Sequence, residues 1–478
     1  MRMPRLVLCA VLIGCGCSER EIATRADDGE KAVEVGPKDP LPPDLRTRKT
    51  GDDWPAFLGP TGDSVSREKG ILTVWPKGGP RVVWQQPLGI GYAMPTISRG
   101  RLFLFDRIRN RCRLRCWNAE TAASIWTFEY NTTYRDQYNY NGGPRCCPVV
   151  DGNRVYVFGP EGMLYCVRAT DGKPVWQLDT KVEFGVIQNF FGVGSTPTIE
   201  GELLLVHIGG SPQGSEKKAF DELEGNGSGL VAFDKYTGKV KWKVSNELAS
   251  YSSPVVRTID KRRLALLFAR GGLIGVDVVT GKQDFRYPWR STLLESVSAS
   301  NPLVVGNQVL ISECYGVGSS LLKLKPGGFD KVWTDDDKSP RERRLLCHWM
   351  TPVHVDGFVY GSSGRHTREA ELRCLELATG KVIWREPGLT RSSLLHVDGH
   401  FVCLSEDGWL RLLRVDPKKF DEVASVQLRM PGKDGKPDPD GEELLDYPCW
   451  AATILSHGLL YVRGEKRLVC LELIPAKK

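Results

Sequence analysis

Four arginines, two histidines and one tryptophan in this sequence could together bind an anionic or aromatic group. An arginine guanidinium is planar and permanently charged, so it can hold a carboxylate or a phosphate through two parallel hydrogen bonds. An indole ring stacks on a sugar or an aromatic group at little cost in conformational entropy. The residues are Arg145, Arg270, His348, Trp349, Arg365, His366 and Arg391. They predict a non-catalytic surface that binds a partner protein, a peptide or a glycan.

The arginines also allow a second interpretation, in which they stabilise the fold. The acids Glu161, Glu313, Glu406 and Asp407 occur in comparable segments of the chain. Each acid could neutralise one arginine in a structural network, and removal of one partner would then leave a buried charge unpaired. The residue types alone leave both interpretations open.

A further group of residues could bind a cofactor. Glu161, Asn301 and Glu313 carry the carboxylate and amide oxygens that Ca²⁺ prefers. Cys146 and Cys147 are adjacent, so in an oxidising compartment they form either a disulfide between neighbours or two free thiols. The sequence has no Cys-x-x-Cys-His haem motif and no cysteine pair with zinc-like spacing to histidines. No metal site is therefore predicted, and no aspartate stands where a catalytic base is needed.

The elements that must position these residues form a repeat. In its plainest copy Pro148 opens a strand and Asp151-Gly152 forms a hairpin turn into a second strand. A third strand follows from Met163, and Asp171-Gly172-Lys173 turns the chain into a fourth strand that carries Trp176. Each copy therefore predicts a four-stranded antiparallel meander, and repeats of this length are typical of propeller blades.

Five related copies begin at a proline and end at an aromatic residue, at Pro95–Trp126, Pro197–Trp242, Pro254–Phe285, Pro302–Trp333 and Pro352–Trp384. A degenerate copy covers about 394–428, and a last copy from about Ala451 stops one strand short. The segment 81–88 looks like a fourth strand without the other three. Pairing it with the C-terminal blade closes a ring and removes open sheet edges. We therefore predict an all-β, eight-bladed β-propeller; a ring of seven blades is the main alternative.

In such a meander the second-to-third loops, the interblade loops and the starts of the inner strands share one face. The seven binding candidates all fall in those segments. Two of the long interblade loops also carry aromatic residues, which are Tyr130, Tyr134, Tyr138 and Tyr140 in one and Phe184, Phe190 and Phe191 in the other. We therefore expect one polar, aromatic-walled pocket at the mouth of the central channel.

The repeat resembles that of the quinoprotein-type (PQQ-like) family. Its Gly-x-Leu-Tyr…Thr-Gly-Lys-x-x-Trp pattern recurs, and the segments 53–60 and 75–80 look like the opening of PQQ-like envelope proteins. The resemblance covers about 51–478. The family includes PQQ dehydrogenases and the propeller lipoprotein of the outer-membrane barrel-assembly machinery. For a dehydrogenase of alcohols or sugars, it implies PQQ and Ca²⁺ near Glu161, Asn301, Glu313 and a Cys146–Cys147 disulfide. That function is the alternative to a binding module.

The N-terminal residues have the pattern of a lipoprotein signal peptide. Arg2 and Arg5 precede the apolar stretch 6–13, and Leu12-Ile13-Gly14-Cys15 resembles a lipobox. We expect a signal peptide over 1–14, acylation of Cys15 and a disordered tether over 15–50 that leads to the propeller at 51–478. The expected location is periplasm-facing on an envelope membrane, with Gly16 favouring the outer one; an ordinary secretory signal is the alternative. No later run reaches the ~18 apolar residues of a membrane span.

The net charge of +7 comes from basic and acidic residues that are interspersed along the chain. This distribution predicts no nucleic-acid surface. Because the predicted ring leaves no open edge, we expect the propeller to be monomeric.

Overall fold

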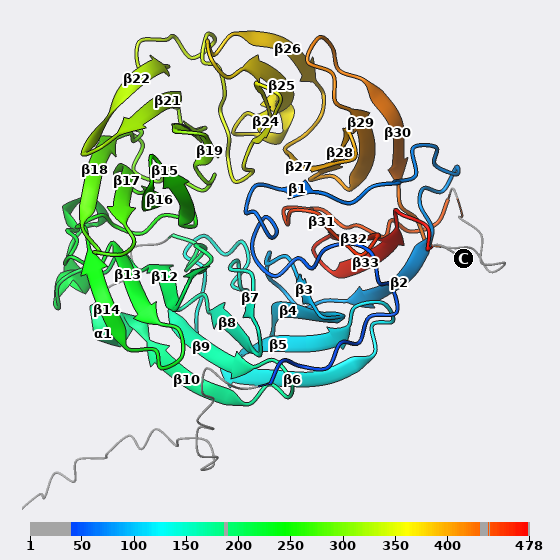
Figure 1. Ribbon diagram of the computed structural model, residues 1–478, viewed down its shortest axis with the longest axis horizontal. Helices are drawn as coiled ribbons and strands as arrows, with labels where there is room; N and C mark the ends of the chain where they lie inside the picture. The colour runs from blue at the N-terminus through cyan, green and yellow to red at the C-terminus, as the bar shows by residue number, and fades with distance from the viewer. Residues whose placement is uncertain (1–39, 186–189, 431–437, 439, 477–478) are drawn as a thin grey trace, which may run out of the picture. The chain divides into compact units, whose positions relative to one another are not determined.

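The computed structural model describes residues 40–185, 190–430, 438 and 440–476. Their strands form eight antiparallel sheets arranged as blades around a central channel, which confirms the predicted eight-bladed propeller (Figure 1). The first strand of each blade lies nearest the channel. No helix among the described residues is both long and apolar enough to cross a membrane.

Four blades cover the first half of the ring. Blade 1 comprises β3 (Thr96–Ser98), β4 (Arg101–Ile108), β5 (Arg111–Asn118) and β6 (Ser124–Asn131). Blade 2 comprises β7 (Val149–Asp151), β8 (Arg154–Phe158), β9 (Met163–Arg168) and β10 (Pro174–Asp179). Blade 3 comprises β11 (Thr198–Glu200), β12 (Leu203–His207), β13 (Leu230–Asp234) and β14 (Val240–Val244). Blade 4 comprises β15 (Val255–Ile259), β16 (Arg262–Ala269), β17 (Gly272–Asp277) and β18 (Gln283–Pro288).

Four more blades complete the ring. Blade 5 comprises β19 (Leu303–Val305), β20 (Gln308–Glu313), β21 (Gly318–Lys325) and β22 (Gly328–Thr334). Blade 6 comprises β23 (Val353–Val355), β24 (Phe358–Ser363), β25 (Glu371–Glu376) and β26 (Val382–Pro387). Blade 7 comprises β27 (Ser392–Val397), β28 (His400–Ser405), β29 (Trp409–Arg414) and β30 (Glu422–Gln427). Blade 8 comprises β31 (Ile454–Ser456), β32 (Leu459–Arg463), β33 (Arg467–Glu472) and β2 (Val82–Pro87).

Helical segments are short and lie between strands. They are α1 (Thr180–Phe184) and the 3-10 turns η1 (Ser215–Lys217), η2 (Phe220–Glu222) and η3 (Thr367–Glu369). The core sits between neighbouring blades, because the middle strands are buried on both faces: all five residues of β8 are buried. Outer strands such as β6 alternate between partly buried and exposed residues, which is the period expected of a half-buried strand.

The recurring tryptophan of the fourth strand ties one blade to the next. Trp126 Nε1 in blade 1 donates to the backbone oxygen of Ala169 in blade 2, at 3.0 Å. Equivalent bonds start from Trp84, Trp176, Trp333 and Trp384. The glycine of the repeated turn packs against the same ring: a Cβ on Gly172 would lie 2.5 Å from the Trp126 ring. The repeated glycine and tryptophan are therefore the two halves of one contact between blades.

The two ends of the propeller share blade 8, as predicted. β2 pairs antiparallel with β33, and Trp84 is opposite Cys470 in that register. Trp84 Nε1 also donates to Ala119 O of blade 1, at 2.9 Å. The N-terminal strand therefore closes the ring and fixes it to blade 1.

The chain before β2 is bound more extensively than the sequence predicts. Thr47 N donates to Glu120 at 2.8 Å, and Arg48 pairs with Glu472 of β33. The expected tether 15–50 therefore differs from the structure in its last residues, which lie on the blades.

β1 (Val65–Ser66) adds a fifth, parallel strand to blade 7, beside β27. Neither feature has a local sequence pattern, since the partners are distant in the chain: 73 residues separate Thr47 from Glu120, and 424 separate Arg48 from Glu472.

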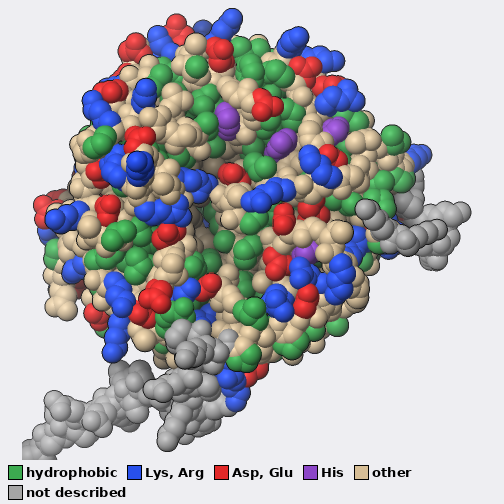
Figure 2. Space-filling view, viewed as in Figure 1, with side chains coloured by type: hydrophobic (Ala, Val, Ile, Leu, Met, Phe, Trp, Pro, Cys, Tyr) green, Lys and Arg blue, Asp and Glu red, His purple; other side chains and the backbone are tan. Residues whose placement is uncertain are grey.

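Basic and acidic side chains are interspersed over the described residues of the face drawn in Figure 2. Exposed ion pairs among the described residues include Lys325 with Asp330 and Arg414 with Asp421. No large patch of one sign is visible on that face.

Candidate functional site: the channel-mouth pocket

A cavity of about 900 Å³ opens at one end of the central channel, a volume within the ~300–1,000 Å³ of ligand pockets. We call it the mouth pocket. Its aromatic lining residues are Phe57, Tyr92, Tyr138, Tyr140, Phe191, Tyr251, Tyr315, Trp349, Tyr447 and Trp450. Its charged lining residues are Arg145, Arg365, Arg368, Arg391, Glu295 and Glu369, and His348 and His366 also line it.

The N-terminal segment 54–62 closes the other end of the channel. Trp54 exchanges backbone hydrogen bonds with Ile97 of β3, and Pro55 O accepts one from Val150 N of β7. The guanidinium of Arg257 in β15 donates a hydrogen bond to Thr61 O. Phe57 of this segment lines the mouth pocket. The segment that resembles a family opening motif is therefore a plug, and the mouth pocket is a blind cup with Phe57 at its base.

One wall of the mouth pocket is built on a buried ion pair. The fully buried Glu406 accepts hydrogen bonds from Arg391 Nη2 at 2.6 Å and from Trp450 Nε1 at 2.8 Å. Burial opposes ionisation of Glu406, but these bonds outweigh it and lower the pKa of its carboxyl. The Arg391 guanidinium lies 4.5 Å from the centre of the Trp349 ring, and that ring is 4.9 Å from Trp450. Glu406 therefore positions three pocket residues at once.

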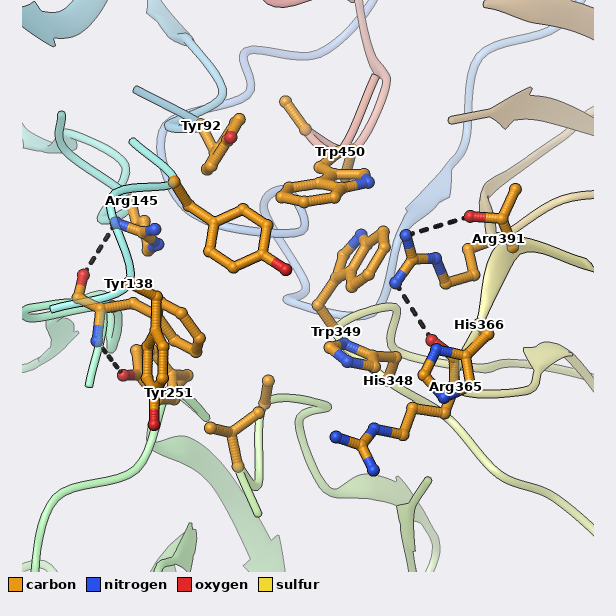
Figure 3. Close-up of a pocket in the computed structure, with 18 of the residues that line it drawn as sticks. Tyr92, Tyr138, Arg145, Tyr251, His348, Trp349, Arg365, His366, Arg391 and Trp450 are labelled. Atoms are coloured by element: carbon orange, nitrogen blue, oxygen red, sulfur yellow. Dashed lines mark hydrogen bonds between the residues drawn. The ribbon is translucent and has the colours of Figure 1, made fainter. Parts of the chain in front are cut away.

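The opposite wall is built around Arg145 (Figure 3). Its guanidinium donates to Phe191 O at 2.8 Å and pairs with the buried Asp136 at 3.2 Å. It also lies 5.4 Å from the centre of the Tyr92 ring. The hydroxyl of Tyr251 accepts a hydrogen bond from the backbone N–H of Phe191, at 2.7 Å. Arg145 is therefore held in place between the aromatic residues that surround it.

Arg365 and His348 occupy the wall between these two. Arg365 lies 4.5 Å from the centre of the Tyr315 ring, and no hydrogen bond or ion pair joins its guanidinium to another described residue. His348 Nε2 is 3.2 Å from the Tyr315 hydroxyl. Burial, and then the neighbouring Arg391 and Arg365, lower the pKa of His348 to about 3. His348 is therefore neutral at pH 7, and Arg365 is a charged group beside it.

Six of the seven binding candidates from the sequence line the mouth pocket, and Arg270 does not. Arg270 is 5% exposed, and its guanidinium lies 3.4 Å from the centre of the Phe220 ring of η2. The insertion before β13 supplies that ring, so it covers Arg270 and separates it from the cavity. The sequence places Arg270 in the correct loop but does not show which neighbour would cover it.

The structural-network interpretation holds for part of the set. Glu406 pairs with Arg391, while Arg145 pairs with Asp136, an acid that the sequence reasoning did not select. Glu161 accepts from the Thr132 hydroxyl at 3.0 Å instead. Neither carboxylate oxygen of Glu313 has a hydrogen-bonding partner among the described side chains.

The residues proposed for PQQ and Ca²⁺ do not fit that role. Asn301 Oδ1 accepts the backbone N–H of Ser253 at 2.8 Å, and of the five candidates only Cys147 lines the mouth pocket. Cys146 and Cys147 are free thiols, and Cys146 Sγ donates to Ser195 O at 3.2 Å. Among the described residues, no group of three or more His, Cys, Asp and Glu side chains could hold a metal ion. Of the three proposed calcium ligands, Glu161 and Asn301 are therefore hydrogen-bonded within the fold, and none of the three lines the mouth pocket.

Sequence reasoning missed several pocket residues. Tyr251 lies just before Pro254, which opens one of the repeat copies, so a search for aromatic residues that precede an inner strand would have found it. Phe57 and Tyr447 reach the pocket through the plug and a long interblade loop, and no local signal identifies them. The predicted lipidation site, Cys15, lies outside the described residues.

The chain resembles one family of known proteins along more than half its length. The sequence model of the family described as outer membrane protein assembly factor BamB matches residues 110–386. The curated BamB of Burkholderia pseudomallei (strain K96243) is 24% identical over 269 residues, which are 55% of this chain. The chain spans 60% of the length of that relative.

Two solved structures have a similar fold. BamB from Moraxella catarrhalis aligns with a TM-score of 0.52 and 12% identity, over 82% of this chain and 97% of that one. The quinohemoprotein alcohol dehydrogenase ADHIIG from Pseudomonas putida HK5 aligns with a TM-score of 0.57 and 11% identity, over 89% and 81%. At these identities the likeness concerns the fold alone.

Proposed function

The chain belongs to the family described as outer membrane protein assembly factor BamB, and on that premise we propose that it is a non-catalytic binding module of the cell envelope. We propose that a partner protein docks over the mouth pocket. The observation that supports this most is the convergence of ten aromatic side chains and four arginines on one blind cavity. Buried aromatic and arginine residues are the side chains that dominate binding energy at protein interfaces.

The groups in the mouth pocket favour binding over acid–base catalysis. His348 has a pKa near 3, so it is a weak base at neutral pH. Burial raises the pKa of the Cys147 thiol to about 12, so it is a poor nucleophile. The two lining acids, Glu295 and Glu369, are exposed. In contrast, the Glu406–Arg391–Trp450 contacts hold the wall in one arrangement before a ligand arrives, which favours affinity.

Exposed apolar side chains extend the mouth pocket outwards. Tyr140 is 64% exposed and Tyr447 is 54% exposed, and both line the cavity. Because large exposed apolar residues beside a pocket mark interaction sites, the ligand should extend beyond the cavity, as a protein does.

Photocrosslinking in cells tests this function. We would place p-benzoylphenylalanine at Tyr140 on the mouth and, as a matched exposed control, at Val279 in the turn between β17 and β18. We expect the Tyr140 position to yield a discrete crosslinked protein that mass spectrometry identifies, and the Val279 position to yield none. Crosslinking at Val279 alone, or at neither position, would overturn the proposal.

We also propose that acylated Cys15 anchors this module to the outer membrane, facing the periplasm. The lipobox-like segment before Cys15 and the family match support this location. Replacing Cys15 with Ser should move the folded protein from the membrane fraction to the soluble fraction, because the acyl chains are lost. An unmodified, soluble wild-type protein would contradict the anchor.

A further inference from the structure

We infer that the mouth pocket takes an extended peptide segment that presents a carboxylate to Arg365 and apolar side chains to the aromatic walls. This inference rests on the proposed function and adds the chemistry of the ligand. It starts from the four pocket arginines, which differ in how they are used.

Two of the four arginines are already committed to the fold. Arg391 is bound to Glu406 through both Nε and Nη2, and Arg145 is bound to Asp136 and to two backbone oxygens. Arg365 and Arg368 form no ion pair or hydrogen bond through their guanidinium groups within the described part of the chain, and both line the cavity. An incoming carboxylate therefore meets its free donors on the 365–368 wall.

Glu313 is a buried acid near Arg365 that could neutralise its charge, but the two side chains form no ion pair. It is 2% exposed, ends β20 two residues before Tyr315, and has no hydrogen bond to either carboxylate oxygen among the described side chains. The cations that act on it are Arg290, Arg343 and Arg365, and the thiol of Cys314 lies beside it. Burial outweighs the backbone N–H of Tyr315 and those cations, which all lower the pKa, and it raises the pKa of Glu313 to about 8.

At pH 7 Glu313 is therefore mostly protonated, and Arg365 keeps a charge that no neighbour cancels. A guanidinium stacked on a ring, as Arg365 is on Tyr315, keeps its in-plane N–H groups available for a carboxylate. Glu313 thus acts as a positioning residue: it leaves Arg365 available without touching the ligand.

The lining favours a peptide over a glycan. No amide side chain lines the mouth pocket among the described residues, and its two carboxylates, Glu295 and Glu369, are exposed rather than set into the wall, although planar amides and carboxylates are the groups that bind the hydroxyls of neutral sugars. A polyanionic chain would need a stripe of cations, whereas the free arginines are confined to one short wall. The exposed apolar rim at Tyr138, Tyr140 and Tyr447 instead suits the side chains of a longer polypeptide.

A direct binding assay tests the inference. The probe is a fluorescein-labelled, end-blocked nonapeptide of alternating glutamate and phenylalanine, and the matched probe has glutamine in place of glutamate. We expect fluorescence anisotropy to show about tenfold tighter binding of the acidic probe, because a charge-assisted bond at Arg365 is lost with glutamine. Arg365→Ala should remove that difference, and Arg365→Lys should retain only part of it because the planar fork is lost.

Two further variants make the assay specific. Arg67→Ala removes an exposed arginine beside β1, away from the mouth pocket, and should leave both affinities unchanged. Binding of the acidic probe should weaken as pH rises from 6 to 9, because ionised Glu313 offsets the charge of Arg365. Glu313→Gln should abolish that pH dependence while the acidic probe still binds. A pH profile unchanged by Glu313→Gln would overturn the role of Glu313.

Each other outcome counts against the inference. Equal affinity for the two nonapeptides, or an Arg365→Ala variant that folds with an unchanged melting temperature and still discriminates between them, would overturn it. Tighter binding of a heparin fragment or of phosphatidylglycerol vesicles than of the acidic probe would also overturn it, in favour of another anion. If crosslinking at Tyr140 still captures a protein, the proposed function survives these failures; absence of crosslinking removes the function itself.

Discussion

At the residue scale, the mouth pocket depends on one buried carboxylate. Glu406 is fully buried, and its ionised form holds both Arg391 and Trp450. A buried ion pair is a costly arrangement, because each ion loses its hydration and only good geometry offsets the loss. Its presence here serves to fix the wall of a cavity whose other residues need a rigid support.

Replacing Glu406 with Ala should lower the free energy of unfolding by about 3 kcal/mol, because it leaves Arg391 buried without a counter-charge. Chemical denaturation would measure the loss. Replacing Asp421, whose partner Arg414 is exposed, with Ala is the matched control and should cost less than about 1 kcal/mol. Similar losses in the two variants would show that Glu406 does not support the wall.

Glu406 also predicts a pH dependence. Its pKa is lowered in the folded protein, so its contribution is present above the pKa of the unfolded chain and is lost as pH falls through the folded pKa. The wild-type protein should therefore lose stability towards acid more steeply than Glu406→Gln. Parallel stability curves for the two proteins between pH 6 and 3 would contradict this.

At the element scale, the blade is a unit that bonds to its neighbour through one tryptophan. Trp126, Trp176, Trp333, Trp384 and Trp84 each donate their indole N–H to a backbone oxygen of the following blade. Blade 4 has Phe285 at this position, and Trp242 of blade 3 has an indole N–H with no partner among the described residues. The repeat therefore contains tryptophans at equivalent positions that do and do not form the interblade hydrogen bond, and these can be compared by mutation.

Trp126→Phe should destabilise the protein by about 1 kcal/mol, since the Ala169 carbonyl loses its hydrogen-bond donor. Trp242→Phe is the matched control, because it removes an N–H that makes no bond. Both variants keep an aromatic ring against the turn glycine of the next blade. Thermal unfolding should therefore show a lower Tm for Trp126→Phe than for Trp242→Phe, and the reverse order would refute the interblade bond.

The contact between the N-terminal segment and blade 8 depends on a histidine. His457 Nε2 is 2.9 Å from Asp53 Oδ1, and Nδ1 is 3.0 Å from Thr50 O. Burial lowers the pKa of His457 and Arg46 opposes its protonation, but the bonds to Asp53 and Thr50 prevail and raise it. A raised pKa means stability that is full below the unfolded value near 6.5 and is lost as pH rises through the folded value.

Wild-type stability should therefore decline between about pH 6 and pH 8 more than that of His457→Gln, which has no charge to lose. Chemical denaturation across this range would measure it, and limited proteolysis within residues 40–60 should accelerate over the same interval. A decline that persists unchanged in His457→Gln would assign it to another group.

At the scale of the whole molecule, ring closure is the property that the N-terminal strand provides. β2 completes blade 8, and the plug and β1 hold the inner strands of blades 1, 2, 4 and 7. Removing these elements would expose a sheet edge, which is a template for association with other chains.

Deleting residues 1–39 should leave the Tm unchanged, while deleting 1–88 should lower it by more than ~10 °C and produce oligomers. The first deletion stops before the described contacts begin, and the second removes β2 and the plug. Deleting 1–50 should give an intermediate Tm, because it removes the Arg48–Glu472 pair. Calorimetry with size-exclusion chromatography would measure both effects. Equal Tm values for the 1–39 and 1–88 deletions would refute closure through two termini.

The class of fold follows from the sequence alone, and so do the number of blades and the pairing of the strand at 81–88 with the C-terminal blade. Local sequence patterns indicate these features: a turn pair such as Asp151-Gly152, a strand in which apolar and polar residues alternate, and Trp176 after the third turn. Because blades 1 to 7 are built mainly from contiguous chain, the signals for their strands and turns lie within a few dozen residues of one another, whereas the pairing of β2 with β33 follows from the strand that the C-terminal copy lacks. The same reasoning collected six of the seven selected residues at one cavity, since strand starts in a meander share a face.

The roles of those residues depend on contacts that form only in the folded propeller. Phe57 lines the cavity, and Phe220 packs on Arg270. Glu406 forms an ion pair with Arg391, whereas Arg365 stacks on Tyr315 without an acidic partner among the described residues. These outcomes depend on residues that are distant in the chain and meet through loops without periodic pattern. Their energies arise from burial and charge pairing, which exist only once the ring has closed.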